Sequence, residues 1–390
     1  MVQYEDVKKT FADLVSVDSP SLHEEQMAEQ IKKLFAEIGI TLCEDDSAKL
    51  TGSTTGNLYA YVKGDGKKAP VLLAAHLDTV MPAYGKKAVF TADGTAKSDG
   101  TTVLGADDLA GVTEIYHAMK YLKENQIAHR DTELLFTVSE ELYCKGAKAF
   151  DYGRIKSKSA YVLDLSGRIG DAAYAAPTIL SYCVTINGKA AHAGFSPEEG
   201  RNAIAAAAKA IAQLPQGRID DVTTANIGMI SGGSGVNIVS EQCTVQGEIR
   251  SLNHEKAVAL AKTYREQFTK AAQDLGASAE WKETVDIQAY ETSLDSDVVR
   301  EYKKAAFDVG VEAKFLKTFG GSDNNVFFQH GIEGIVIACS MNNVHSCKEY
   351  ANVHEMVTVT EILIRLLAEN EDILQDFSRS LSYTEYRKQV

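Results

Sequence analysis

Short apolar runs alternate with helical stretches over most of this 390-residue chain, and this alternation constrains its fold more than any other feature. Residues 57–62, 71–75, 133–138 and 160–163 resemble strands, and Leu109–Leu122 carries apolar residues at helical spacing. The pattern resumes in the last quarter of the chain. Strands that alternate with helices predict an open, doubly wound α/β sheet with helices on both faces.

The stretch from Thr178 to Tyr290 follows a different order. It reads as a strand, a helix, two strands, a long helix and a strand, which is the β-α-β-β-α-β order of a ferredoxin-like unit. We therefore predict a small domain of residues 178–290, inserted into a catalytic domain formed by residues 1–177 and 291–390. The chain is long enough for two domains.

Composition limits the class of partner. The chain carries 54 acidic and 40 basic residues, and an acidic surface argues against nucleic acid or an anionic membrane as a partner. The six cysteines form no Cys-x-x-Cys pair, which indicates free thiols in a reducing compartment. The first residues lack the pattern of a signal peptide, and no apolar run approaches the ~18 residues of a membrane-spanning helix. We expect a soluble cytoplasmic protein.

Acidic and imidazole side chains follow several of the apolar runs. His76 and Asp78 come after the run that ends at Ala75, and residues two apart on a strand face the same side. This arrangement offers an imidazole metal ligand and the carboxylate that orients it. Asp107 precedes a helix, where it is either a helix cap or a carboxylate that bridges two cations. Asp108 can be the cap if Asp107 is the bridge.

Glu140 and Glu141 stand side by side at the end of the run Leu134–Val138. Two carboxylates in one apolar neighbourhood are costly unless a metal or a proton neutralises one of them. We therefore predict that Glu141 binds metal and that Glu140 stays free to accept a proton from the attacking water. Asp164 and His345 follow two further apolar runs.

These groups share one position, at or soon after the end of an apolar run, and ligands of open α/β sheets bind at that edge. Histidine, aspartate and glutamate without cysteine suit zinc, manganese or cobalt. His354 is the alternative to His345, but it stands at the start of the last helical region. The chain has no Gly-x-Ser-x-Gly stretch and no cysteine beside a candidate base, which argues against a nucleophilic serine or cysteine hydrolase.

Two residues of the inserted domain also qualify for substrate binding. Arg250 ends a strand, and an arginine can hold a carboxylate through two parallel hydrogen bonds. His192 stands on a loop, from which it can donate to a developing oxyanion.

The stretches that carry these residues resemble the co-catalytic zinc metallopeptidases that include aminoacylase-1 and succinyl-diaminopimelate desuccinylase. The matching stretches extend almost from end to end of the chain: 75–80, 100–111, 139–141, Asp164, 192–194, 320–323 and 344–345. The stretch Gly-Ala-Asp-Asp-Leu-Ala-Gly at residues 105–111 indicates the peptidase T branch of this family. Asp-Leu-Ser-Gly at residues 164–167 differs from the Asp-Gly-Gly of peptidase T itself, so we expect a peptidase T-like relative.

The resemblance implies an aminopeptidase-type α/β catalytic domain and a lid domain through which two copies form a dimer. It implies two divalent metal ions, most often zinc. One metal takes His76, Asp107 and Asp164, and the other takes Asp107, Glu141 and His345.

The resemblance also implies roles for the remaining groups. Asp78 orients His76, Glu140 acts as general base and then as general acid, and the Asp107–Asp108 peptide bond is cis. The substrate-binding group consists of His192, Asn237, Arg250, Gly321 and Ser322.

Together, these patterns predict a two-metal aminopeptidase that hydrolyses the N-terminal peptide bond of short peptides, as a tripeptidase does. An N-acyl-amino-acid deacylase with the same metal site and a different pocket is the nearest alternative. A non-catalytic binding protein that retains the fold is a third, and it would lack a metal ligand or the base.

Overall fold

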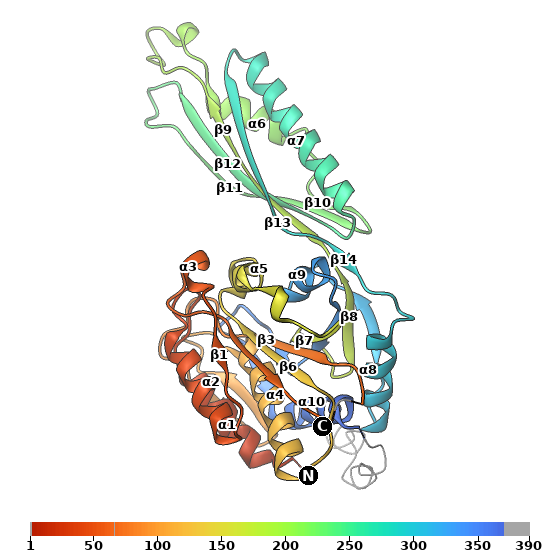
Figure 1. The fold of residues 1–390 in the computed structure, drawn as a ribbon. Helices are drawn as coiled ribbons and strands as arrows, with labels where there is room; N and C mark the ends of the chain where they lie inside the picture. The colour runs from red at the N-terminus through yellow and green to blue at the C-terminus, as the bar shows by residue number, and fades with distance from the viewer. Residues whose placement is uncertain (1, 66, 370–390) are drawn as a thin grey trace. The chain divides into compact units, whose positions relative to one another are not determined.

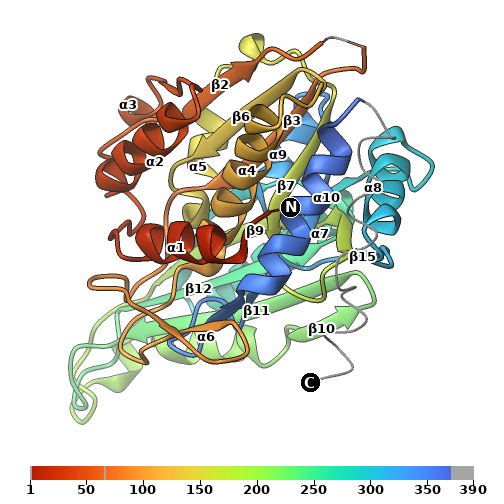
Figure 2. The same ribbon diagram turned by 90° about the horizontal axis from the view of Figure 1, so that it is seen from below.

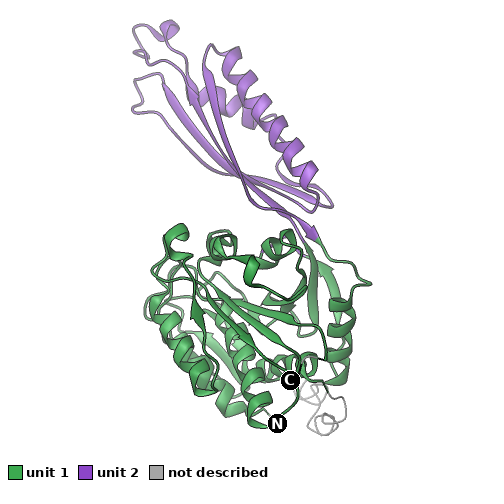
Figure 3. Ribbon diagram, in the orientation of Figure 1, with its two compact units in different colours: residues 1–175, 291–317, 322–390 green, residues 176–290, 318–321 purple. Residues whose placement is uncertain are grey.

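The protein is described by a computed structural model that covers residues 2–65 and 67–369, and its chain divides into two units (Figures 1 and 3). Unit 1 consists of residues 1–175, 291–317 and 322–390, and unit 2 of residues 176–290 and 318–321. Unit 2 thus starts two residues before the small domain that the sequence predicts, and it includes a later loop. Residues 370–390 of the predicted catalytic domain lie outside the described residues.

Unit 1 is built from helices around a large sheet and a small one. Its helices are α1 (Tyr4–Val15), α2 (Glu25–Glu37), α3 (Ala48–Thr51), α4 (Ala106–Glu124), α5 (Lys145–Ala149), α8 (Asp297–Asp308), α9 (Asp323–Gln329) and α10 (Val353–Leu367). The large sheet contains β1 (Cys43–Glu44), β2 (Leu58–Val62), β3 (Val71–His76), β6 (Thr132–Thr137), β7 (Ser159–Leu165), β8 (Asp171–Ala176), β14 (Tyr290–Glu291), β15 (Lys314–Lys317) and β16 (Glu333–Ala338). The small sheet contains β4 (Ala88–Phe90), β5 (Thr95–Ser98), β17 (Met341–Asn342) and β18 (Tyr350–Asn352). None of the helices in the described residues is both long enough and apolar enough to cross a lipid bilayer.

The large sheet has a parallel centre. Its strands follow the order β1-β2-β6-β3-β7-β16-β8-β14, with β15 beside β8. Strands β6, β3, β7 and β16 are mutually parallel, whereas β2 and β8 run antiparallel to their inner neighbours. Every residue of β3 and β6 is buried, as expected for parallel strands covered on both faces. The carboxyl ends of the parallel strands therefore meet at one edge of the sheet.

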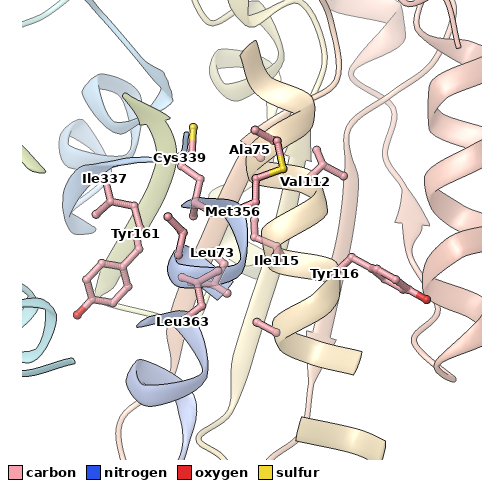
Figure 4. Packing of buried hydrophobic residues seen from close by; sticks show 14 of the residues in the cluster. Leu73, Ala75, Val112, Ile115, Tyr116, Tyr161, Ile337, Cys339, Met356 and Leu363 are labelled. Atoms are coloured by element: carbon pink, nitrogen blue, oxygen red, sulfur yellow. The ribbon is translucent and has the colours of Figure 1, made fainter. Parts of the chain in front are cut away.

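Helices cover both faces of this parallel centre. Leu73 and Ala75 of β3 belong to the core cluster that includes residues of α4 and α10 (Figure 4), and α1, α4 and α10 lie next to one another (Figure 2). Helix α9 packs on the opposite face, where a Cβ added at Gly334 of β16 would lie 2.0 Å from Asn324 Oδ1. A glycine at this position therefore lets α9 approach the sheet closely.

Unit 2 is an antiparallel sheet with two helices. Its elements are β9 (Thr178–Asn187), α6 (Ala203–Ile211), β10 (Gly217–Asp220), β11 (Thr223–Gly232), β12 (Gln242–Ser251), α7 (His254–Asp274) and β13 (Ser278–Ile287). The strand order β10-β11-β12-β9-β13 is the ferredoxin-like order with the short strand β10 added at one edge. Tyr264 and Phe268 of α7 are fully buried in a core separate from that of unit 1.

The predicted fold class, an α/β catalytic domain with an inserted ferredoxin-like domain, is confirmed. The sequence did not predict the small sheet of unit 1, helix α9, or strands β8 and β10.

Candidate metal centre

His76 is the last residue of β3 and is almost fully buried. Its Nδ1 lies 2.9 Å from the backbone oxygen of Asp78 and 3.5 Å from Asp78 Oδ1, while its Nε2 lies 3.0 Å from Asp107 Oδ1. Burial alone would lower the pKa of His76, but its bonds to Asp107 and Asp78 raise it well above the ordinary value. Asp78 thus fixes the imidazole mainly through its carbonyl group, and Nε2 faces the acidic cluster.

The Asp78 carboxylate has a second role that the sequence did not predict. It accepts the backbone N–H groups of Glu140 at 2.8 Å and Glu141 at 3.2 Å, and the hydroxyl of Ser21 donates to it at 2.7 Å. A buried carboxylate with several donors is well compensated for the loss of water. Asp78 therefore connects the end of β3 to the turn that carries both glutamates.

Asp107 stands between two imidazole rings. Its Oδ1 lies 3.0 Å from His76 Nε2, and its Oδ2 lies 3.2 Å from His345 Nε2. Burial opposes ionisation of Asp107, but the bonds from His345 and His76 lower its pKa far below the ordinary value. The Asp107–Asp108 peptide bond is cis, as the resemblance implies. The two oxygens of this carboxylate face two different histidines, which is the geometry expected of a group that bridges two metal ions.

Asp108 bonds to backbone groups of His76 and Gly111. Its Oδ2 accepts the backbone N–H of His76 at 3.1 Å, and the carboxylate also accepts from the backbone of Gly111. The structure therefore favours Asp108 as the group that caps the start of the helix and Asp107 as the bridge.

Glu140 and Glu141 lie in a tight turn after β6. Residues 140–142 form a single 3-10 turn, flanked by Ser139, Tyr143 and Cys144 with φ values of 51°, 63° and 56°. This left-handed backbone is uncommon for residues other than glycine, and it leaves the strand direction at once. Both glutamates therefore leave the alternating faces of β6 and point into the same cluster.

Glu141 pairs with His345. Its Oε2 lies 3.0 Å from His345 Nε2, and its Oε1 is buried without a hydrogen-bond partner among the described residues. Burial and the neighbouring Asp107 raise the pKa of Glu141. A buried acceptor without a partner costs free energy, and a cation at this position would remove that cost.

Asp164 completes the cluster from β7. His76, Glu140 and Asp164 offer ligand atoms within 4.8 Å of one another, and so do His76, Asp107 and Glu141. Burial raises the pKa of Asp164 well above its ordinary value, and the Glu140 and Asp107 carboxylates add to this shift. The cluster thus holds more negative charge than its two imidazoles can balance, so its residues fit divalent cations.

All five predicted metal ligands lie at the carboxyl edge of the large sheet: His76, Asp107, Glu141, Asp164 and His345. The alternative ligand His354 belongs to none of these groups. Its ring packs at a tilt of 31° against Tyr4, with ring centroids 4.5 Å apart, and burial lowers its pKa.

The predicted substrate-binding residues lie mainly in unit 2. Nδ1 of His192 accepts the backbone N–H groups of Gly194 and Phe195 at 3.1 and 3.2 Å, and the His192 ring stacks on Phe195. The backbone oxygen of Asn237 accepts from Ala193 in the same loop region. These local bonds shape the His192 loop.

Arg250 on β12 is engaged by groups of its own unit. Its Nε and Nη2 donate to the two oxygens of Glu248 at 2.7 and 3.1 Å, and its Nη1 donates to the backbone oxygen of Phe319 at 2.9 Å. Gly321 follows in the same loop, whereas Ser322 belongs to unit 1 and stands at the start of α9.

Sequence reasoning missed two buried groups beside Glu140. Cys144 Sγ lies 3.3 Å from Glu140 Oε1, so the expectation that no cysteine stands beside a candidate base is wrong. Asp323, the first residue of α9, forms a further group with Glu140 and Cys144. The position of Asp323 directly after Gly-Gly-Ser could have identified it as a site residue, whereas no sequence pattern pointed to Cys144.

A second missed carboxylate supports the Asp107 loop. Glu349 is buried, and its two oxygens accept the backbone N–H groups of Leu104, Gly105 and Asp107 at 2.7 to 3.0 Å. Burial raises the pKa of Glu349 to about 7, although these three bonds oppose the shift.

Comparisons with known proteins agree with this arrangement. Residues 57–213 match the model of peptidase family M28, and residues 174–275 match the peptidase dimerisation domain of the M20 type. The chain is 38% identical to the uncharacterised protein YqjE of Bacillus subtilis over 95% of its own length and 99% of that protein.

Two solved structures are similar over almost the whole chain. The aminopeptidase PepT of Bacillus cereus is 37% identical, with a TM-score of 0.87, and the alignment covers 94% of this chain and 98% of that one. A tripeptidase of Staphylococcus aureus is 30% identical, with a TM-score of 0.91 and the same coverage of both chains.

The chain is a peptidase T-like member of the M20 family. The predicted family, its peptidase T branch and a metal-dependent peptidase are thereby confirmed. In this M20 peptidase the family's expected ligands occur in unit 1, and the match to the dimerisation domain covers most of unit 2.

Proposed function

We propose that this M20 peptidase removes the N-terminal residue from short peptides, with tripeptides as its main substrates. The observation that carries this proposal is the position of Asp107 between His76 and His345, with Glu140 close to the same cluster. The names of the similar proteins, an aminopeptidase and a tripeptidase, support the substrate class.

We propose two divalent cations, zinc in the first place and manganese or cobalt as alternatives. His76, Asp107 and Asp164 would hold one of them, and Asp107, Glu141 and His345 would hold the other. Bound cations of this kind supply Lewis acidity, which activates water and polarises a carbonyl group. Imidazole and carboxylate ligands without a thiol suit all three metals.

The protein's own groups then position and move the proton. Asp78 holds His76 and the backbone of the Glu140 turn, so the base has a fixed position relative to the ligands. Glu140 accepts a proton from the attacking water and returns it to the leaving amine. Burial raises the pKa of Glu140 well above its ordinary value, with Asp323 and Glu141 adding to the shift, which favours acceptance of the proton from water.

Substrate binding is assigned to the residues of unit 2 and the adjoining loop. Arg250 would bind the carboxylate at the C-terminus of the peptide, and His192 would donate to the oxyanion of the scissile carbonyl. Asn237, Gly321 and Ser322 would hold the peptide backbone.

Unit 2 would also mediate a homodimer. The match of residues 174–275 to a peptidase dimerisation domain supports this assembly, and β11 exposes the apolar side chains of Met229 and Ile230. We further place the enzyme in the cytoplasm, where buried thiols such as Cys144 and Cys339 stay reduced.

The test is a substrate panel on zinc-loaded and manganese-loaded protein. It should contain free tripeptides, dipeptides, N-acetylated tripeptides and N-acyl amino acids, with product release followed by mass spectrometry. We expect the highest kcat/KM on free tripeptides and a strong loss when the amino group is acetylated. Preference for N-acyl amino acids would instead identify a deacylase, and failure to hydrolyse any member would favour a binding protein.

A further inference from the structure

Three side chains meet beside the expected metal ligands, in a group that contains neither imidazole. Glu140, Cys144 and Asp323 each offer a ligand atom, and these atoms lie within 4.8 Å of one another. Cys144 Sγ is 3.3 Å from Glu140 Oε1, and the backbone N–H of Cys144 donates to the Glu140 carbonyl at 2.7 Å. The turn itself therefore places the thiol over the carboxylate, and Asp323 arrives from α9.

The aspartate of this group has an unused oxygen. Asp323 is only 2% exposed, and the Thr137 hydroxyl donates to its Oδ2. Its Oδ1 is buried without a hydrogen-bond partner among the described residues. An unpaired buried carboxylate oxygen beside a thiol and a second carboxylate is an incomplete arrangement, and a cation would complete it.

We propose that Glu140, Cys144 and Asp323 form an additional metal site that binds zinc present in excess and thereby inhibits the enzyme. The inhibition depends on the proposed role of Glu140 as the base, whereas binding at the site does not. A cation held by Glu140 occupies the oxygens that must accept the proton of water, so the base cannot act.

The donor set determines which metal the site takes. A thiolate with two carboxylates suits zinc or cobalt, whereas manganese prefers oxygen ligands. Binding requires that the Cys144 thiol release its proton to solvent as the sulfur–metal bond forms. Among the described residues, the two candidate ligand groups that contain His76 include no cysteine, so a metal–thiolate signal separates the additional site from the expected pair.

Binding is tested first, with cobalt as the probe. Cobalt is titrated into the full-length apo protein under anaerobic conditions, and bound metal is counted by equilibrium dialysis while thiolate-to-cobalt absorption is recorded. We expect an equivalent beyond the first two to bind with this absorption in the wild type. Cys144→Ser keeps a hydroxyl donor for Glu140 but should lose both the extra equivalent and the absorption.

Cys347→Ser is the matched control because Cys347 stands two residues after His345 and is a free thiol near that ligand in sequence. It should keep the extra equivalent and the absorption. Loss of the absorption in Cys347→Ser, its persistence in Cys144→Ser, or saturation of the wild type at two equivalents would each overturn the proposal.

Inhibition is tested next, on the best peptide of the substrate panel. For each variant, the rate with excess zinc is divided by the rate with two equivalents, so that changes in basal activity cancel. Loss of a general base costs about 100-fold or more, and we expect the wild-type rate to fall by about that factor at saturation. Cys144→Ser and Asp323→Asn should each show less than about a tenth of that inhibition, and excess manganese should not inhibit the wild type.

The two proposals fail in different ways. If no peptide is hydrolysed but the extra cobalt binds through Cys144, the proposed function is wrong and the metal site stands. If peptides are hydrolysed and the extra metal binds without slowing turnover, the inhibitory role is wrong.

Discussion

The carboxyl edge of the large sheet in unit 1 and the sheet of unit 2 use polar side chains in different ways. In unit 1, groups from five separate segments point at one another, and several have buried oxygens without partners or pKa values far from ordinary. In unit 2, His192 and Arg250 are bound by neighbours on the same or adjacent segments.

This difference decides how far the function of each region can be inferred from its own contacts. The buried carboxylates of the acidic cluster repel one another, and a bound cation would reduce this repulsion. Metal binding at the cluster can therefore be inferred from unit 1 alone. Arg250 and His192 are already satisfied locally, so their assignment depends on the resemblance to known peptidases. Substrate binding by Arg250 must compete with Glu248. Metal binding at the acidic cluster must replace the contacts that His76 and His345 make with Asp107 and Glu141.

The largest effect is expected at Glu140. Glu140→Gln keeps the shape and the backbone bonds to Asp78 but removes the proton acceptor, so kcat should fall by about 1,000-fold. Metal content, measured by mass spectrometry of the purified protein, should stay at the wild-type value because the predicted ligands are intact. A variant with near wild-type kcat would show that another group is the base.

Separate cores predict separate unfolding of the two units. Phe268→Ala empties a fully buried position in the core of unit 2, and Phe136→Ala does the same on β6 in unit 1. Each should cost about 3–5 kcal/mol in its own unit. Calorimetry of the metal-loaded protein should show a lower transition for unit 2 alone in the first variant and for unit 1 alone in the second. A single transition that shifts equally in both variants would contradict this independence.

A buried histidine away from the cluster should contribute to acid sensitivity. Burial lowers the pKa of His117 to about 4, and its ring bonds to the hydroxyl of Thr10 at 3.0 Å. Because the folded pKa lies below the unfolded value near 6.5, stability falls as pH drops through this interval, by about 3 kcal/mol at pH 4.

The check compares wild type with His117→Gln in urea unfolding at several pH values. The difference in unfolding free energy between the two proteins should stay constant above pH 7 and should move in favour of the variant below pH 6. A difference that does not change with pH would show that the pKa of His117 is the same in the folded and unfolded protein.

The smallest effect is expected at Arg250. Arg250→Ala should lower kcat/KM for free tripeptides by about 10- to 100-fold, the value of a charge-assisted hydrogen bond. The loss should nearly vanish on tripeptide amides, which lack the carboxylate. Arg265→Ala on the exposed side of α7 is the control and should be neutral. An equal loss on acids and amides would mean that Arg250 only supports the loop of Phe319.

Most of the candidate metal ligands could be placed from sequence because they stand at the end of an apolar strand, and strand ends meet at a common edge in a parallel sheet. His76, Asp164 and the Glu140–Glu141 pair carried this signal, whereas Asp107 was marked by its position before a helix. His345 was separable from His354 only by its position before the last helix. The choice of His345 agrees with its 3.0 Å and 3.2 Å approaches to Glu141 and Asp107.

Other features were beyond sequence reasoning for physical reasons. Strands β4, β5 and β18 have three or four residues of mixed polarity, so they show no clear periodicity. The bonds of Glu349 to the Asp107 loop and the place of Cys144 beside Glu140 depend on tertiary packing and on a left-handed turn. Local sequence preference disfavours that conformation rather than predicting it.

The hydrogen bonds from the Asp107 loop to Glu349 join segments that are synthesised far apart in time. The donors and the acceptor are 242 to 245 residues apart, and the whole of unit 2 is translated between them. Until residue 349 has been synthesised, the backbone N–H groups of residues 104, 105 and 107 lack the Glu349 carboxylate as their acceptor. The Asp107 loop therefore gains this support only after residue 349 has been synthesised.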